Sequence, residues 1–103
     1  MNTETIKKRI IFVDDDENIG QAMKRMLRPM RNDWEMTFCT DGEDALKTME
    51  ETGAFDIIVS DMHMPRMHGH ELLTRVMEQY PQTIRFALSG SPGADTTVKT
   101  SAI

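Results

Sequence analysis

Carboxylates and one hydroxyl group stand at three points of this chain where chemistry could take place. Asp14, Asp15 and Asp16 form a run of acids, and Asp61 and Ser89 each follow an apolar stretch. Two carboxylates ~4 Å apart repel each other by about 4 kcal/mol at an effective dielectric of about 20, so a cluster needs a cation beside it. Mg²⁺ suits such a cluster because it prefers carboxylate, water and phosphate oxygens as ligands. Mn²⁺, which also accepts these ligands, is an alternative.

Asp61 is the candidate nucleophile of this set. A carboxylate can attack phosphorus and form an acyl phosphate, and a metal ion beside it neutralises charge on the transferred group. Ser89 would then donate a hydrogen bond to the attached phosphoryl group, and Gly90 has no side chain to block access. A plainer interpretation is that Asp14 and Asp16 only cap a following helix and that Ser89 lies in a turn.

Strands and helices are expected to alternate before and after these residues. Short apolar runs predict four strands, at residues 9–13, 34–39, 55–59 and 84–88. Apolar residues three and four apart predict three helices between the strands, which end near Pro29, Gly53 and Pro81. The tail from residue 95 to residue 103 is expected to begin a fourth helix, with Asp95 as its cap.

This alternation predicts an α/β domain over residues 1–103, with parallel strands and right-handed crossovers. Ligands of such sheets bind beyond the carboxyl ends of the strands. If the first, third and fourth strands are adjacent, the acids after the first strand meet Asp61 and Ser89 in one crevice.

Composition narrows the class of protein. The 103 residues contain 12 Lys and Arg against 17 Asp and Glu, and this net charge of -5 argues against direct nucleic-acid binding. Cys39 is the single cysteine, which excludes an internal disulfide and predicts a buried residue in a reducing, cytoplasmic setting. No signal peptide is visible, and no apolar run approaches the ~20 residues of a membrane span, so we expect no membrane contact.

Three segments carry a resemblance to a known family: Ile10-Ile-Phe-Val-Asp-Asp-Asp-Glu17, Ser60-Asp-Met-His-Met-Pro-Arg-Met-His-Gly69 and Ile84-Arg-Phe-Ala-Leu-Ser-Gly90. In order and spacing they resemble the receiver domain of bacterial two-component response regulators, over essentially the whole chain. The resemblance implies a flavodoxin-like, doubly wound sheet with strand order 2-1-3-4.

The resemblance also implies roles for individual residues. Asp61 would be the phosphoacceptor, and Ser89 would be the hydroxyl that senses the phosphoryl group. Asp14, Asp15 and Asp61 would hold Mg²⁺ together with the backbone carbonyl of His63.

As a phosphoprotein of a phosphorelay, the domain would be a signalling module and at most a slow autophosphatase, not otherwise an enzyme. It would take its phosphoryl group from a sensor histidine kinase or from acetyl phosphate. It would then switch an output domain or partner protein outside this chain. The segment at residues 84–90 is similar to receivers that precede HDOD or HD-GYP output domains.

Two departures from the family pattern affect these expectations. His68 stands where most members carry Asp. The family also has a lysine at the end of a fifth strand, but only 14 residues follow Ser89, and the missing elements need more than about 20. We therefore expect the fifth strand, the fifth helix and this lysine to be absent, with Lys99 in the fourth helix. The strand at residues 84–88 would then be an edge, which favours a homodimer, a swapped dimer or a disordered tail.

Two other functions stay open. Asp14-Asp15-Asp16 after an apolar strand is similar to the Asp-x-Asp motif of haloacid-dehalogenase-type phosphatases, with Asp14 as nucleophile and Asp16 as acid and base. Asn18 stands where that motif has Thr or Val, and the chain is short for that fold. A pseudo-receiver, which keeps the fold for protein contacts alone, fits the absent lysine but not the intact set of acids.

Overall fold

The computed structural model describes residues 7–64, 66–89 and 97–100, with the backbone alone described for Ser89 and residues 97–100. In this part of the chain, strands alternate with helices up to β4. The elements are β1 (Lys8–Val13), α1 (Glu17–Met26), the 3₁₀ helix η1 (Arg28–Met30), β2 (Trp34–Cys39), α2 (Gly42–Thr52), β3 (Ile57–Asp61), α3 (Gly69–Gln79), β4 (Ile84–Ser89) and β5 (Thr97–Thr100).

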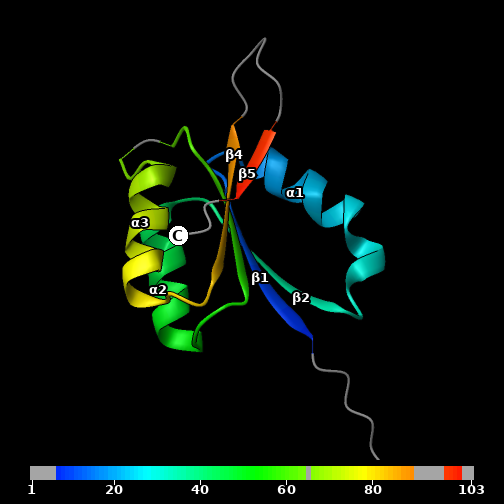
Figure 1. Ribbon diagram of the computed structural model, residues 1–103. Helices are drawn as coiled ribbons and strands as arrows, with labels where there is room; N and C mark the ends of the chain where they lie inside the picture. The colour runs from blue at the N-terminus through cyan, green and yellow to red at the C-terminus, as the bar shows by residue number, and fades with distance from the viewer. Residues whose placement is uncertain (1–6, 65, 90–96, 101–103) are drawn as a thin grey trace, which may run out of the picture.

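The strands form one sheet in the order β2-β1-β3-β4-β5. The first four strands of this order are parallel, so the order 2-1-3-4 and the flavodoxin-like fold are confirmed. Helices α2 and α3 cover one face of the sheet, and α1 lies on the other face (Figure 1). None of these helices combines the length and the hydropathy that a membrane span requires, within the residues described.

The hydrophobic core lies between the sheet and the pair α2 and α3. Period-two alternation in β1 sends Ile11 and Val13 into this core, where both are almost fully buried. Helices α2 and α3 supply side chains at helical spacing to the same cluster: Ala45, Met49, Leu72, Leu73 and Val76. Cys39 is buried at the end of β2, as predicted.

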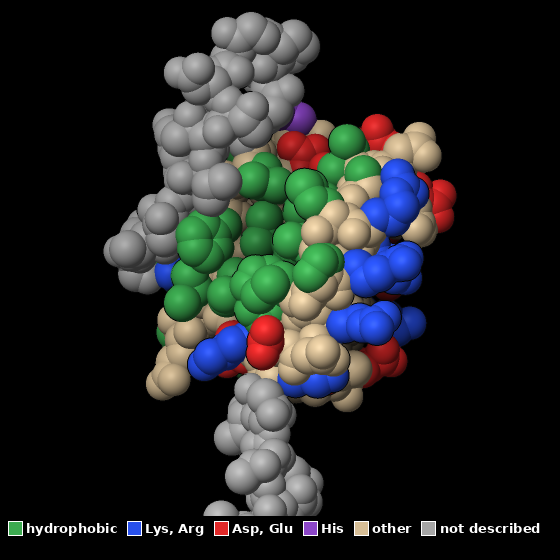
Figure 2. Space-filling model, turned by 90° about the vertical axis from the view of Figure 1, so that its right-hand side faces the viewer, with side chains coloured by type: hydrophobic (Ala, Val, Ile, Leu, Met, Phe, Trp, Pro, Cys, Tyr) green, Lys and Arg blue, Asp and Glu red, His purple; other side chains and the backbone are tan. Residues whose placement is uncertain are grey.

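The face that carries α1 is packed less completely. The predicted helix is confirmed, but it contains no buried residue, and Ile19 and Met26 remain 43% and 69% exposed. On the same side of the sheet, Ile84 of β4 is 49% exposed. Figure 2 shows apolar side chains in view on this side of the molecule. The spacing of apolar residues therefore predicted the position of α1 correctly, but it did not predict that the apolar side of α1 stays largely exposed.

The ends of the helices follow the predicted signals. Asp41 caps α2 by accepting a hydrogen bond from the backbone N–H of Asp44 at 2.7 Å, and Gly53 ends that helix with φ of 94°. Pro29 lies in η1, directly after α1 has ended. These local signals come from a few neighbouring residues, which is why the sequence locates them well.

The tail differs from the prediction. Thr97–Thr100 forms β5, which pairs antiparallel to β4 with Lys99 opposite Ala87, so a helix over these residues is wrong. The predictions that β4 is an edge and that a fifth strand is absent are wrong for the same reason, whereas the homodimer or swapped dimer stays a prediction. Unpaired backbone groups of β4 accept a partner strand, and threonine and valine favour extended structure. Asp95, the predicted cap, lies outside the described residues.

Candidate functional site

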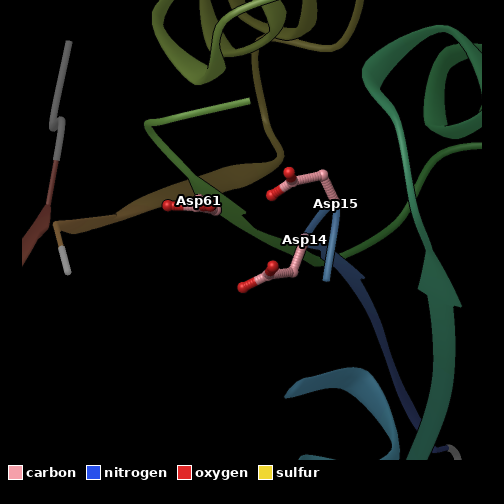
Figure 3. Close-up of side chains that lie close together, drawn as sticks. All are labelled: Asp14, Asp15 and Asp61. Atoms are coloured by element: carbon pink, nitrogen blue, oxygen red, sulfur yellow. The ribbon is translucent and has the colours of Figure 1, made fainter. Parts of the chain in front are cut away.

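Three carboxylates meet at the carboxyl ends of β1 and β3. Asp14 and Asp15 follow β1 directly, and Asp61 is the last residue of β3. Since β1 and β3 are parallel neighbours with Val13 opposite Ser60, the two ends lie side by side. Each aspartate offers an oxygen atom, and these atoms all lie within 4.8 Å of one another. Figure 3 shows the three carboxylates gathered beyond the strand ends.

The loop after β1 is held by its own acids. The Oδ1 atom of Asp14 accepts a hydrogen bond from the backbone N–H of Asp16 at 2.9 Å, and the backbone N–H of Asp14 donates to the carbonyl of Cys39 at 3.1 Å. Asp16 in turn caps α1, because its Oδ1 accepts from the N–H of Asn18 at 2.9 Å. The capping interpretation is therefore correct for Asp16, while Asp14 and Asp15 belong to the carboxylate cluster.

Asp61 is half-buried and held on two sides. Its Oδ1 atom accepts a hydrogen bond from the backbone N–H of His63 at 3.2 Å. The fully buried Ser60 hydroxyl donates to the carbonyl of Asp61 at 3.0 Å, and the N–H of Met62 donates to the carbonyl of Leu88 at 3.1 Å. The end of β3 is thereby fixed against β4, and the Asp61 carboxylate has a defined direction.

The charges of the carboxylate cluster affect the pKa of Asp14. Burial raises the pKa of the Asp14 carboxyl above its ordinary value of 3.8, and the charges of Asp61, Asp15 and Asp16 raise it further. The hydrogen bond from Asp16 opposes these effects and lowers the pKa, but it does not cancel them. A cation among the carboxylates would relieve the same repulsion.

The loop between β3 and α3 is anchored by two buried methionines, which sequence reasoning did not select for this site, and by the close packing of Gly69. Met64 and Met67 are 2% and 5% exposed and belong to the core cluster, so the loop is tied down on both sides of residue 65. Gly69 packs so closely on the end of β3 that a Cβ atom built there would overlap the carbonyl oxygen of Asp61. The Met-x-x-Met spacing and the glycine were the available signals, but neither reveals packing without the fold.

The other predicted site residues are placed less completely. His63 is exposed and touches the site through its backbone N–H. Ser89 ends β4, the strand that pairs with β3, but its side chain lies outside what the structure describes. His68 is exposed and precedes α3 without capping it through its side chain.

Comparisons with known proteins agree with this geometry. Residues 10–102 match the family model described as the response regulator receiver domain. The chain is 38% identical over 69 residues to the two-component response regulator ARR14 of Arabidopsis thaliana, a match that covers 66% of this chain and 18% of that protein. It is 36% identical over 84 residues to the regulatory protein VanRB of Enterococcus faecalis, with 79% of this chain and 36% of that protein covered. The matched segment is thus a minor part of these relatives.

Solved structures show the same likeness. The signal receiver domain of an HD domain-containing protein from Pseudomonas fluorescens Pf-5 superposes with a TM-score of 0.76 at 33% identity, covering 84% of this chain and 67% of that one. The chemotaxis response regulator CheY4 of Vibrio cholerae superposes with a TM-score of 0.72 at 29% identity, covering 85% and 72%.

Proposed function

The chain belongs to the response regulator receiver family, and from that premise we propose that Asp61 accepts a phosphoryl group in a metal-dependent reaction. The observation that carries this proposal is the convergence of oxygen atoms from Asp14, Asp15 and Asp61 within 4.8 Å at one edge of the sheet. Phosphoryl transfer depends mainly on positioning and on neutralising charge, and this edge offers a fixed carboxylate beside a cation-binding set.

The donor set fits Mg²⁺ or Mn²⁺. Two oxygen atoms bound to the same Mg²⁺ lie at most about 4.2 Å apart, because each bond is about 2.1 Å long. Cis ligand atoms of the same octahedron lie only about 3.0 Å apart, so carboxylates whose oxygen atoms lie within 4.8 Å of one another have to close in on the ion when it binds. Asp14, Asp15 and Asp61 would hold the ion, together with the backbone carbonyl of His63. When bound, the ion would neutralise charge on the phosphoryl group and align the donor.

Asp61 itself carries the covalent step. The hydrogen bond from His63 to Oδ1 fixes the carboxylate and leaves Oδ2 to attack phosphorus. A bond forms between Oδ2 and phosphorus, the bond from phosphorus to the donor's leaving atom breaks, and that atom keeps the electron pair. Ser89 would then donate its hydroxyl to the attached phosphoryl group from the end of β4.

A sensor histidine kinase, or acetyl phosphate as a small donor, would supply the phosphoryl group. The phosphorylated domain would switch a separate output domain or partner protein. Similarity to the receiver of an HD domain-containing protein favours an output of that kind. We expect this domain to act as a signalling module whose own chemistry is limited to slow loss of the phosphoryl group.

The phosphatase alternative has less support from the site. It needs Asp16 as acid and base, but Asp16 Oδ1 is engaged as the cap of α1. It also needs Asp14 as nucleophile, and a carboxyl whose pKa is raised by burial and by neighbouring charges is less readily ionised for that role.

Intact mass after treatment with acetyl phosphate tests the proposal. We expect a gain of one phosphoryl group that requires Mg²⁺, is abolished in Asp61→Asn and is reduced in Asp14→Asn. A gain that persists in Asp61→Asn but disappears in Asp14→Asn would instead identify the phosphatase. No gain in the wild-type chain at any Mg²⁺ concentration would favour the pseudo-receiver.

A further inference from the structure

A groove with an apolar floor lies between α1, η1 and β2, on the face of the sheet away from the hydrophobic core. Its floor consists of Trp34, Met36 and Phe38, which are all half-buried. The groove has a volume of about 490 Å³ and continues into a hollow of about 330 Å³ beside Phe12 and Leu88. Since Met36 and Phe38 line both, the floor forms one continuous apolar strip.

One wall of the groove is basic. Lys24, Arg25, Arg28 and Arg31 all line it, and no acidic residue among those described lines the groove, whereas Asp14, Asp16 and Glu17 line the adjoining hollow. These four are a third of the chain's 12 Lys and Arg, and residues 18–32 contain no Asp or Glu. Among the described residues, none of the four has a carboxylate within ion-pair distance. Figure 2 shows Lys and Arg side chains along one side of the apolar patch.

Four cations that pair with none of the described carboxylates, beside an apolar strip, indicate the chemistry of an occupant. An apolar side would bury the half-exposed floor, and acidic side chains along one edge would meet the basic wall. An amphipathic helix with an acidic flank combines both features, and helices commonly bind in apolar grooves in this manner.

A second copy of this chain matches the groove poorly. Pairing of two identical grooves would bring basic walls together. The acids of α2, such as Glu43 and Glu50, lie on a helix without a large exposed apolar side chain among the described residues. We propose that this groove binds an acidic amphipathic helix of a separate protein. The proposal does not depend on whether Asp61 accepts a phosphoryl group.

Trp34 provides a direct test, because it is the chain's single tryptophan and lies in the floor of the groove. The probe is a synthetic helical peptide with leucines and a phenylalanine on one face and glutamates along its flank. A matched peptide carries lysines in place of the glutamates. We expect the acidic peptide to shift Trp34 emission to shorter wavelength, with saturation, and to bind at least about tenfold more tightly than the basic peptide.

Charge reversal in the groove supplies the matched variants. Arg28→Glu should weaken binding of the acidic peptide several-fold. Lys47→Glu makes the same charge change at an exposed residue of α2, outside the groove, and should leave binding unchanged. The double variant Arg28→Glu with Arg31→Glu should bind the basic peptide more tightly than the wild-type chain does. This gain of binding cannot result from unfolding.

Several results would overturn the proposal. These are no shift of Trp34 emission with the acidic peptide, equal affinities for the two peptides, or equal losses in Arg28→Glu and Lys47→Glu. Binding of the chain to vesicles of phosphatidylglycerol and phosphatidylcholine is measured in the same way, because Trp34 emission also reports it. Tighter binding to these vesicles than to the acidic peptide would assign the groove to a membrane surface.

Discussion

At the scale of single residues, Asp14 bears the electrostatic strain of the carboxylate cluster. Burial and three neighbouring carboxylates raise its pKa above 3.8. A carboxyl group whose pKa is higher in the folded state than in the unfolded state stabilises the fold most at a pH below its pKa in the unfolded state. This stabilisation is lost as the pH rises through its pKa in the folded state. At neutral pH the ionised cluster therefore opposes folding unless a cation is bound.

Replacing Asp14 with Asn should stabilise the metal-free chain near neutral pH. Asparagine keeps an oxygen that can accept the hydrogen bond from Asp16 but removes the charge. Because Asp14 is only partly buried, we expect a gain of no more than about 1 kcal/mol. Thermal unfolding without Mg²⁺ measures it, and the rise in melting temperature on adding Mg²⁺ should shrink. A lower melting temperature of Asp14→Asn without metal would contradict this expectation.

Mg²⁺ binding should depend on pH through the same group. A proton on Asp14 competes with the ion, so Mg²⁺ affinity should rise as the pH passes upward through the raised pKa of Asp14. Calorimetric titration at several pH values between about 4 and about 7 measures this. In Asp14→Asn the dependence should be much weaker, and an equally steep dependence there would show that another group controls it.

Cys39 should be unreactive in the folded chain. Burial, and next the negative charge of Asp44, raises the pKa of its thiol to about 11, so almost no thiolate exists at neutral pH. Labelling with a maleimide at about pH 7 should proceed only as fast as the protein opens, and rapidly in denaturant. Equal rates in both conditions would mean that the thiol is accessible in the native state.

The sequence predicted the cluster because strand ends are visible in it. Apolar runs that stop at Asp14 and Asp61, together with parallel topology, suffice to bring these two residues together. It offered a capping role for both Asp14 and Asp16 but could not decide which of the two is a cap, since a run of acids looks the same in both roles. It also missed Met64 and Met67, whose burial depends on contacts with distant residues.

At the scale of elements, the loop from β3 to α3 positions the site through close packing. Gly69 opens α3 while touching the backbone at the end of β3, and a Cβ atom there would lie 2.9 Å from the Cα atom of Met62 as well as overlap Asp61. The geometry of the site thus depends on a residue without a side chain that lies eight positions after Asp61.

Replacing Gly69 with Ala should therefore disturb both stability and phosphorylation. Because the clash involves backbone atoms, we expect a loss of about 1–3 kcal/mol in the free energy of unfolding, measured in urea. The control is Gly20→Ala in α1, where the nearest heavy atom would be Phe38 Cδ1 at 3.9 Å. That change should stabilise the chain by about 0.5–1 kcal/mol, as alanine favours helix. Similar effects of the two changes would rule out the packing role of Gly69.

Elements differ in how far the sequence determines them. The three helices and four parallel strands follow from spacing and from caps such as Asp41, which act over a few residues. The strand β5 was not predicted, because its pairing with β4 depends on which backbone edge is free. The incomplete burial of α1 was also not predicted, since apolar spacing shows which side of a helix can be buried but not what covers it.

At the scale of the whole molecule, the sheet separates two environments. One face packs against α2 and α3 and holds the core, and α1 lies on the other face (Figure 1), where the groove is found. The carboxylates lie at the edge where both faces meet, and Asp14 also lines the hollow that continues the groove. Asp14 therefore borders both the carboxylate cluster and the hollow that adjoins the groove.

The central claim is that the phosphoryl group is attached to Asp61, and its position can be measured directly. The chain is treated with acetyl phosphate and Mg²⁺, the acyl phosphate is reduced with borohydride, and the modified residue is located by peptide mass spectrometry. We predict that borohydride converts Asp61 to homoserine only after treatment with both acetyl phosphate and Mg²⁺. Reduction at Asp14 or Asp15 with Asp61 unmodified would contradict the claim.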